Sequence, residues 1–218
     1  MKSLLVCASL VLASAIVFAQ QGPPSGGQQG GPPSAGQQGG PPSGMPAGAP
    51  SGMRMGQPGG APQSPAAKAS VTIAGKTISI DYSSPRVRGR EGKIFTKDGL
   101  ISQNPHYPVW RGGANAATTL HTDANLTIGS LNVPAGTYTL FVYISDPAHW
   151  VLVVSKDTGE WGLSYDSTKD LGRTPMQTSK PPSMVEDLVY TLTDNGGGKG
   201  TLTLTWEDMT ASVQFTAH

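Results

Sequence analysis

Residues 68–218 contain no stretch with a convincing helical period. Short runs rich in Val, Ile, Thr, Tyr and Trp recur instead, separated by Gly, Asn, Asp and Pro. This alternation of β-forming runs and turn residues is typical of an antiparallel sandwich or barrel. We therefore expect an all-β domain, an antiparallel β-sandwich, with a jelly-roll or barrel-like arrangement as the alternative.

Three regions carry the strongest strand patterns. The run SVTIAGKTISIDY predicts a hairpin that turns at residues 74–76, and GTYTLFVYIS is apolar on both faces, as expected of a central strand. The end of the chain predicts a three-stranded meander from MVEDLVYTLTD, GTLTLTWED and TASVQFTA. Its expected inward side chains are Leu202, Leu204, Trp206, Val213 and Phe215.

The first nineteen residues predict a secretory signal peptide. Lys2 supplies the positive charge, residues 4–12 form a short apolar core, and Val17-Phe18-Ala19 gives a cleavage pattern. The apolar core is shorter than the ~20 residues that a membrane span needs. We therefore expect an exported protein, periplasmic or extracellular, with no transmembrane segment after cleavage. Cys7 is the only cysteine, so neither a disulfide nor a thiol nucleophile is expected after cleavage.

Residues 20–67 predict a disordered Gly/Pro/Ser/Gln-rich linker. They contain 14 Gly and 11 Pro, one charged residue and no aromatic residue. A nine-residue unit repeats as GPPSGGQQG, GPPSAGQQG and GPPSGMPAG. Because these units have almost no apolar surface to bury, they cannot offset the entropy cost of folding. The single folded domain is therefore expected at residues 68–218.

The charge of the domain excludes one class of partner. Thirteen Lys and Arg stand against fourteen Asp and Glu, which gives a net charge near −1. A nucleic-acid-binding domain normally carries a basic surface, so no nucleic acid is expected. No sequence motif calls for a cofactor.

Two segments of the sequence contain candidate binding residues. SSPRVRGREGK places Arg86, Arg88 and Arg90 at alternate positions, on one side if the chain is extended. Asp81, Glu91, backbone carbonyls or an anionic ligand are the candidates to compensate these charges, and the plain interpretation is that the arginines tie a long loop to the sandwich.

The second segment, VWRGGANAAT, contains Trp110, Arg111 and Asn115. If PVWR is a strand, Trp110 packs inward and Arg111 points outward near the following glycines. The glycines permit a sharp bend, and Asn115 is expected to bond the backbone of that bend. The run is either a corner of the fold or a pocket wall.

Catalytic and metal-binding patterns are weak. There is no GxSxG sequence and no closely spaced histidine pair. His121 and Asp123 are the only metal-ligand candidates, and weak ones, because a solvent-facing strand histidine is far commoner than a metal ligand; no metal is therefore expected. A hydrolase would need His106, His121 or Glu91 to meet another catalytic group in a cleft.

Four blocks carry a family resemblance: SPRVRGREGKIF, VWRGGANAATTL, LNVPAGTYTLFV and WVLVVSKDTGEWG. In this order they resemble the bacterial exported family called domain of unknown function 2911, over residues 68–218. The resemblance implies a bacterial exported protein with a compact β-sandwich-like domain, and it implies no activity. The family reads WRTGANEAT where this chain has Gly112 and Ala116, so a polar site that used that Glu would lack one group here.

These observations favour a non-enzymatic domain that binds a ligand or partner in the cell envelope. The expected surface consists of Arg86, Arg88, Arg90, Trp110, Arg111 and Asn115, and its ligand would be a small anion, a sugar or an envelope protein. A hydrolase of envelope polysaccharide or peptide is the alternative. A purely structural interaction module is the third hypothesis.

Overall fold

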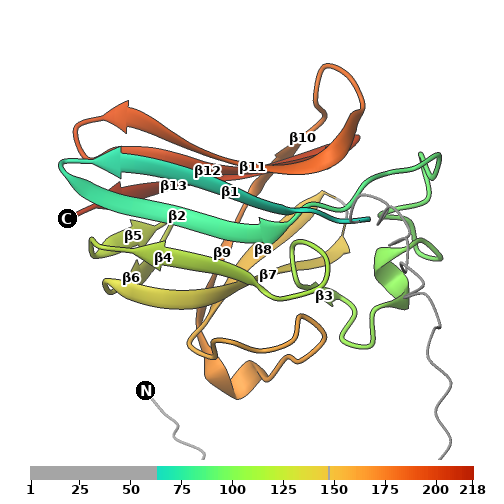
Figure 1. Ribbon diagram of the computed structural model, residues 1–218, viewed down its shortest axis with the longest axis horizontal. Coiled ribbons are helices and arrows are strands. Elements are labelled where there is room, and N and C mark those ends of the chain that lie inside the picture. The colour runs from blue at the N-terminus through green and yellow to red at the C-terminus, as the bar shows by residue number, and fades with distance from the viewer. Residues whose placement is uncertain (1–62, 147) are drawn as a thin grey trace, which may run out of the picture. The chain divides into compact units, whose positions relative to one another are not determined.

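The computed structural model describes residues 63–146 and 148–218. The predicted signal peptide and most of the predicted linker lie outside these residues. The described part is all-β, as expected, and consists of two antiparallel sheets that do not close into a barrel (Figure 1). The sandwich prediction is therefore confirmed over the barrel-like alternative.

The first sheet has seven strands in the order β1-β2-β4-β7-β8-β9, with β3 also paired to β7. The strands are β1 (Ala66–Ile73), β2 (Lys76–Ser83), β3 (Val109–Trp110), β4 (Thr118–Thr122), β7 (Gly136–Asp146), β8 (His149–Ser155) and β9 (Asp170–Pro175). The long strand β7 lies inside this sheet. Leu140 and Val142 face the main core, while Phe141 packs with Val109 and Val153 on the opposite face. This confirms the prediction of a central strand that is buried on both faces.

The second sheet has six strands in the order β11-β12-β13-β5-β6, with β10 also paired to β13. The strands are β5 (Leu126–Ile128), β6 (Leu131–Val133), β10 (Gln177–Ser179), β11 (Val185–Gly196), β12 (Lys199–Glu207) and β13 (Met209–Ala217). Strands β11, β12 and β13 form the predicted meander. All five side chains predicted to face inward there are buried.

The N-terminal boundary differs slightly from the expectation. Strand β1 begins at Ala66, and Ala67 pairs with Tyr82 of β2. The strand therefore starts two residues before the expected boundary at Lys68. Ser64, Pro65, Ala66 and Ala67 resemble the linker in composition, so the start of the strand could not be recognised from the sequence.

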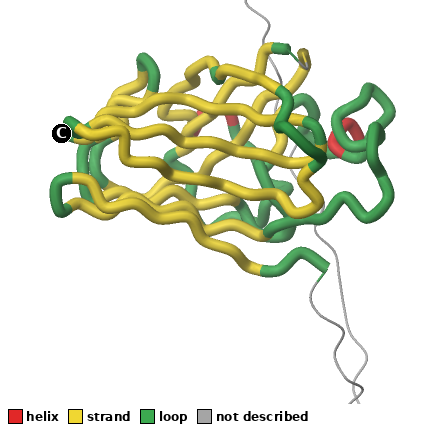
Figure 2. The backbone as a smooth tube through the Cα atoms, turned by 90° about the horizontal axis from the view of Figure 1, so that it is seen from above, coloured by secondary structure: helices red, strands yellow, loops and turns green. Residues whose placement is uncertain are grey.

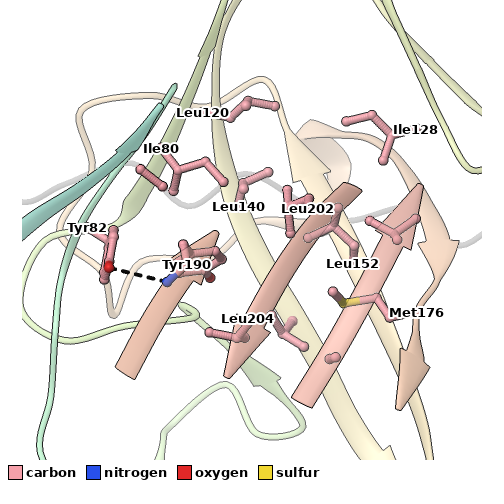
Figure 3. Close-up of a cluster of buried hydrophobic side chains, with 14 of the residues drawn as sticks. Ile80, Tyr82, Leu120, Ile128, Leu140, Leu152, Met176, Tyr190, Leu202 and Leu204 are labelled. Atoms are coloured by element: carbon pink, nitrogen blue, oxygen red, sulfur yellow. Dashed lines mark hydrogen bonds between the residues drawn. The ribbon is translucent and has the colours of Figure 1, made fainter. Parts of the chain in front are cut away.

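The two sheets bury one main core between them. Figure 3 shows side chains from both sheets meeting there, among them Leu140 and Leu152 from the first sheet and Leu202 and Leu204 from the second. Tyr82 and Tyr190 join the sheets directly, because the Tyr190 backbone N–H donates to the Tyr82 hydroxyl at 3.2 Å. Burial of apolar surface of this kind is the main force that holds such a sandwich together.

The longest irregular segment lies at one end of the sandwich. The loop of residues 84–108, which contains the short helix η1 (Ile101–Gln103), lies at the end away from the C-terminus in both views (Figures 1 and 2). A second short helix, η2 (Ser167–Lys169), lies in the loop between β8 and β9. Among the described residues, no helix is long and apolar enough to cross a membrane.

Candidate functional site

The segment VWRGGANAAT forms a tight corner after β3. Trp110 packs inward as predicted and is 2% exposed, whereas Arg111 is half-buried rather than pointing freely into solvent. The Trp110 ring stacks on Trp206 with centroids 5.9 Å apart, and its Nε1 donates to the Gly113 carbonyl at 3.3 Å. The Trp110 ring is therefore too buried to stack on a sugar, which was one of the ligands considered for this surface.

Gly112 is required by the geometry of this corner. Its φ is +61°, and a Cβ atom there would lie 2.3 Å from the Tyr190 hydroxyl oxygen. That hydroxyl donates to the Gly112 carbonyl at 2.9 Å, and complete burial raises the pKa of Tyr190 above its usual range. Only glycine combines this φ with such a close approach.

Asn115 makes a different contact from the expected one. It adopts a positive φ of 57°, and its Nδ2 donates to the Ser64 carbonyl at 3.4 Å. The prediction that Asn115 bonds the backbone of its own bend is therefore wrong. It holds the chain that enters the domain before β1.

The arginine segment turns rather than extending as a strand. Arg88 and Gly89 both have positive φ, and the Arg90 N–H donates to the Val87 carbonyl at 3.3 Å. Two central residues with positive φ are typical of a type I′ turn. The extended conformation, which would have placed the three arginines on one side, is therefore not the one adopted. The three arginines nevertheless converge, because they line one cavity of about 200 Å³ together with Gln63 and Ser64.

Each of these three arginines contacts an acceptor of the protein. Arg86 Nε lies 2.6 Å from Asp187 Oδ1, Arg90 donates to the Val87 and Arg86 carbonyls, and Arg88 Nη2 donates to the Gln63 carbonyl. Carbonyls and one carboxylate thus compensate the cluster. This agrees with the interpretation that the arginines tie a loop to the sandwich.

Three carboxylates of the second sheet hold the same loop. The Arg88 backbone N–H donates to Glu186 Oε1 at 3.0 Å, and Asp187 pairs with Arg86. Glu207 is only 3% exposed, and its Oε1 accepts from the Gly92 backbone N–H. Burial raises the pKa of Glu207, because removal from water disfavours the charged form.

Four aromatic rings close this end of the core. Phe95 comes from the loop and lies 4.9 Å from the Trp150 ring, 5.7 Å from Trp206 and 5.9 Å from Trp110. These are centroid distances in the range of favourable aromatic pairs. The loop is therefore anchored by apolar packing as well as by its polar contacts.

A second cavity, of about 280 Å³, lies beside the first. The two cavities share Pro85, Leu100 and Ala114 in their walls. The larger one is mostly apolar and is lined by Leu100, Ile101, Trp110, Leu163 and Trp206 among others. Arg111 and Asn104 supply polar groups at its wall. The structure therefore brings the two sequence-predicted groups of residues to neighbouring cavities.

Arg111 is electrostatically the most unusual residue of the site. Its Nε donates to the Gly113 carbonyl at 3.3 Å, and among the described residues no carboxylate lies within ion-pair distance of its guanidinium. Partial burial lowers the pKa of Arg111. A guanidinium withdrawn from water without a carboxylate partner favours the binding of an anion.

The comparisons with known proteins identify the family. A family model described as "Protein of unknown function (DUF2911)" matches residues 64–215. The chain belongs to this family. The searches of curated proteins and of solved structures returned no match.

The sequence analysis did not predict that the loop around Gly162 completes the wall of the apolar cavity. Trp161 is 59% exposed, and Leu163 lies in the cavity wall. Gly162 between them packs so closely that a Cβ atom would lie 2.4 Å from Arg111 Cδ. Trp161 stood in one of the blocks that carried the family resemblance, but nothing in the sequence placed it beside Arg111.

The groups proposed for a hydrolase do not meet in this DUF2911 domain. His106 contacts the Tyr165 ring, and neither it, His121 nor Glu91 lines the cavity beside Arg111. His121 Nε2 lies 3.1 Å from Asp123 Oδ1, and its Nδ1 contacts Thr137. Within the described residues no group of three or more His, Cys, Asp and Glu is placed to hold a metal ion. The exposed side chains of His121, on β4, and Asp123, just after it, thus form a hydrogen bond with each other.

Proposed function

We propose that this domain binds a small amphipathic anion. The apolar part of the ligand occupies the cavity between Trp110, Ile101 and Trp206, and its acidic group bonds to Arg111. The cavity lies just below the ~300–1,000 Å³ range of drug-sized sites, so the ligand is small.

The observation that carries this proposal is the state of Arg111. It is half-buried at an apolar cavity, and its guanidinium has one carbonyl contact and no carboxylate partner among the described residues. The planar fork of a guanidinium matches a carboxylate or phosphate in two parallel hydrogen bonds. The apolar wall supports an organic anion over an inorganic one.

Three probe compounds test the proposal by calorimetric titration of the full chain. Benzoate has both parts, benzyl alcohol lacks the charge and acetate lacks the ring. We expect benzoate to bind more tightly than either of the other two. Arg111→Gln weakens benzoate binding roughly tenfold or more, since a hydrogen bond to a charged group contributes about 1.5–3 kcal/mol.

Arg86→Gln is the matched control, because Arg86 pairs with Asp187 and lines only the smaller cavity. Its benzoate affinity is expected to stay within twofold of the wild type. If benzyl alcohol bound as tightly as benzoate, or if Arg111→Gln left the affinity unchanged, the proposal would be wrong.

We further propose that the domain acts in the cell envelope. The support is the pattern of residues 1–19, with a basic start, an apolar core and small residues before Gln20. Mass spectrometry of the protein recovered from the envelope fraction is expected to show a new N-terminus at Gln20. Recovery of the intact chain from the cytoplasm alone would contradict this location.

A further inference from the structure

Four arginines line the two neighbouring cavities beside the corner, and no acidic side chain does. Arg111 belongs to the wall of the apolar cavity, while Arg86, Arg88 and Arg90 belong to the wall of the smaller one. The residues that line the two cavities include neither Asp nor Glu. Because three residues are common to both walls, the cavities adjoin, and one ligand can reach both sets of guanidinium groups.

The contacts that tie the arginine loop to the sandwich use only part of its hydrogen-bonding capacity. A guanidinium has several N–H groups arranged as a planar fork. Arg86 donates through Nε, Arg88 through Nη2, and Arg90 through Nε and Nη2. Within the described part of the chain, the other guanidinium nitrogens of these three side chains donate to no protein acceptor. The loop can therefore keep its structural contacts while the remaining N–H groups bind an acidic group.

The positive charge around the two cavities is only partly compensated. Among the described residues, Asp187 is the one carboxylate within ion-pair distance of any of the four guanidinium groups, at 2.6 Å from Arg86 Nε. Glu186 lies close as well, but its Oε1 accepts from the backbone N–H of Arg88. Four positive guanidinium groups less these two negative carboxylates leave a charge of +2. A ligand with two acidic groups balances this charge, whereas a monoacid balances half of it.

We propose that the smaller cavity is a second subsite for an acidic group, and that the ligand of this domain is a diacid with an apolar body. The body and the first acidic group bind in the apolar cavity and at Arg111. The second acidic group, a carboxylate or a phosphate, binds the guanidinium groups of Arg86, Arg88 and Arg90, whose forks suit either group. The second subsite rests on the arginine cluster alone. Only the joining of both acidic groups in one ligand rests on the proposed function.

Inorganic phosphate tests the second subsite without the apolar cavity. Calorimetric titration of the full chain should show phosphate binding that weakens roughly tenfold or more in Arg88→Gln, because hydrogen bonds between charged groups are lost. Glutamine keeps an N–H group for the Gln63 carbonyl, so the variant can preserve the contact that the Arg88 side chain makes. Arg111→Gln should leave the phosphate affinity within about twofold of the wild type, since Arg111 lines only the apolar cavity.

Lys76→Gln is the matched control for charge. It removes one positive charge at the start of β2, from a residue that lines neither cavity, so its phosphate affinity should stay within about twofold of the wild type. Equal weakening in Lys76→Gln and Arg88→Gln would mean that phosphate responds to the net charge of the protein, and would overturn the second subsite. An unchanged affinity in Arg88→Gln, or no phosphate binding to the wild type, would overturn it as well.

A matched ligand series tests whether one ligand joins the two subsites. Benzoate is compared with isophthalate, terephthalate and para-phenylenediacetate, in which a second carboxylate is carried at increasing distance from the first. At least one diacid should bind roughly tenfold or more tightly than benzoate, and Arg88→Gln should abolish this gain while leaving the benzoate affinity unchanged. Comparison of para-phosphonobenzoate with terephthalate shows whether the second subsite prefers a phosphate-like group or a carboxylate. If no diacid bound more tightly than benzoate, the diacid ligand would be wrong.

The combined results separate this inference from the proposed function. If benzoate does not bind but phosphate binds in a manner that depends on Arg88, the second subsite stands and the site at Arg111 fails. If benzoate binds through Arg111 while phosphate does not bind and no diacid gains affinity, the site at Arg111 stands and the second subsite fails.

Discussion

The meander of β11–β13 and the loop of residues 84–108 pack against each other, but different forces hold each of them in place. The meander buries every second side chain, with Leu202, Leu204 and Trp206 almost inaccessible to water. The loop has apolar anchors at Val87, Ile94, Phe95 and Ile101, and hydrogen bonds and an ion pair hold the segments between them.

The difference shows why the structure of the meander can be predicted from the sequence and that of the loop cannot. Burial at every second position leaves a periodic trace in the sequence, and the meander was predicted strand by strand. The loop contacts join partners far apart in the chain: 101 residues separate Arg86 from Asp187, and 115 separate Gly92 from Glu207. No pattern of neighbouring residues in the sequence predicts such long-range pairs.

The largest expected effect comes from Trp206, where the two regions meet. Trp206→Ala removes a ring that contacts Phe95 of the loop and Trp110 of the corner. We expect a loss of about 3–5 kcal/mol in the free energy of unfolding, the usual cost of a buried Trp→Ala change. Urea denaturation followed by circular dichroism measures it. A double-mutant cycle with Phe95→Ala then sharpens the comparison, because additive losses would show that the loop and the meander are independent.

Gly112→Ala is expected to have the next largest effect. The new Cβ atom meets the Tyr190 hydroxyl in a backbone conformation that alanine avoids, so the cost should be about 2–4 kcal/mol. Differential scanning calorimetry would show a lower Tm. Tyr190→Phe in the Gly112→Ala background removes the clashing oxygen and should recover part of the loss; no recovery would show that backbone strain alone is responsible.

The corner after β3 shows how much of the candidate site could be predicted from the sequence. The inward Trp110 followed from strand alternation in PVWR, whereas the partial burial of Arg111 did not. The positive φ of Arg88 could not be predicted in the same way, so the turn between Arg86 and Arg90 was not anticipated. Trp161 and Leu163 lie beside Arg111 through a packing contact of Gly162 across about fifty residues of chain. Such a contact has no sequence period.

The contact between Glu207 of the meander and the loop should make the stability of the protein depend on pH. Because its folded pKa is raised, the protonated form is favoured in the folded state, and stability falls as the pH rises from the ordinary Glu value near ~4.3 through the raised pKa. Glu207→Gln should remove this fall, and at neutral pH its free energy of unfolding should lie within about 1 kcal/mol of the wild type, or above it. Urea denaturation between pH 4 and 8 gives the difference between the two proteins. A parallel pH dependence in both would show that Glu207 is not the group responsible.

Arg86→Ala is expected to have the smallest effect. The pair with Asp187 is short, but both side chains are nearly half-exposed, so its removal should cost less than about 1 kcal/mol. Chemical denaturation of Arg86→Ala, Asp187→Ala and the double variant at low and high salt measures the coupling. A coupling above about 2 kcal/mol would mean that this exposed pair, rather than the buried contacts, fixes the loop.

The most direct test of the anion site is a crystal structure with 4-bromobenzoate. The account predicts an anomalous bromine peak in the cavity between Trp110 and Trp206, and a carboxylate in hydrogen-bond contact with Arg111. A bromine peak elsewhere, or a carboxylate bound to Arg86 or Arg88 with Arg111 untouched, would contradict the central role of Arg111.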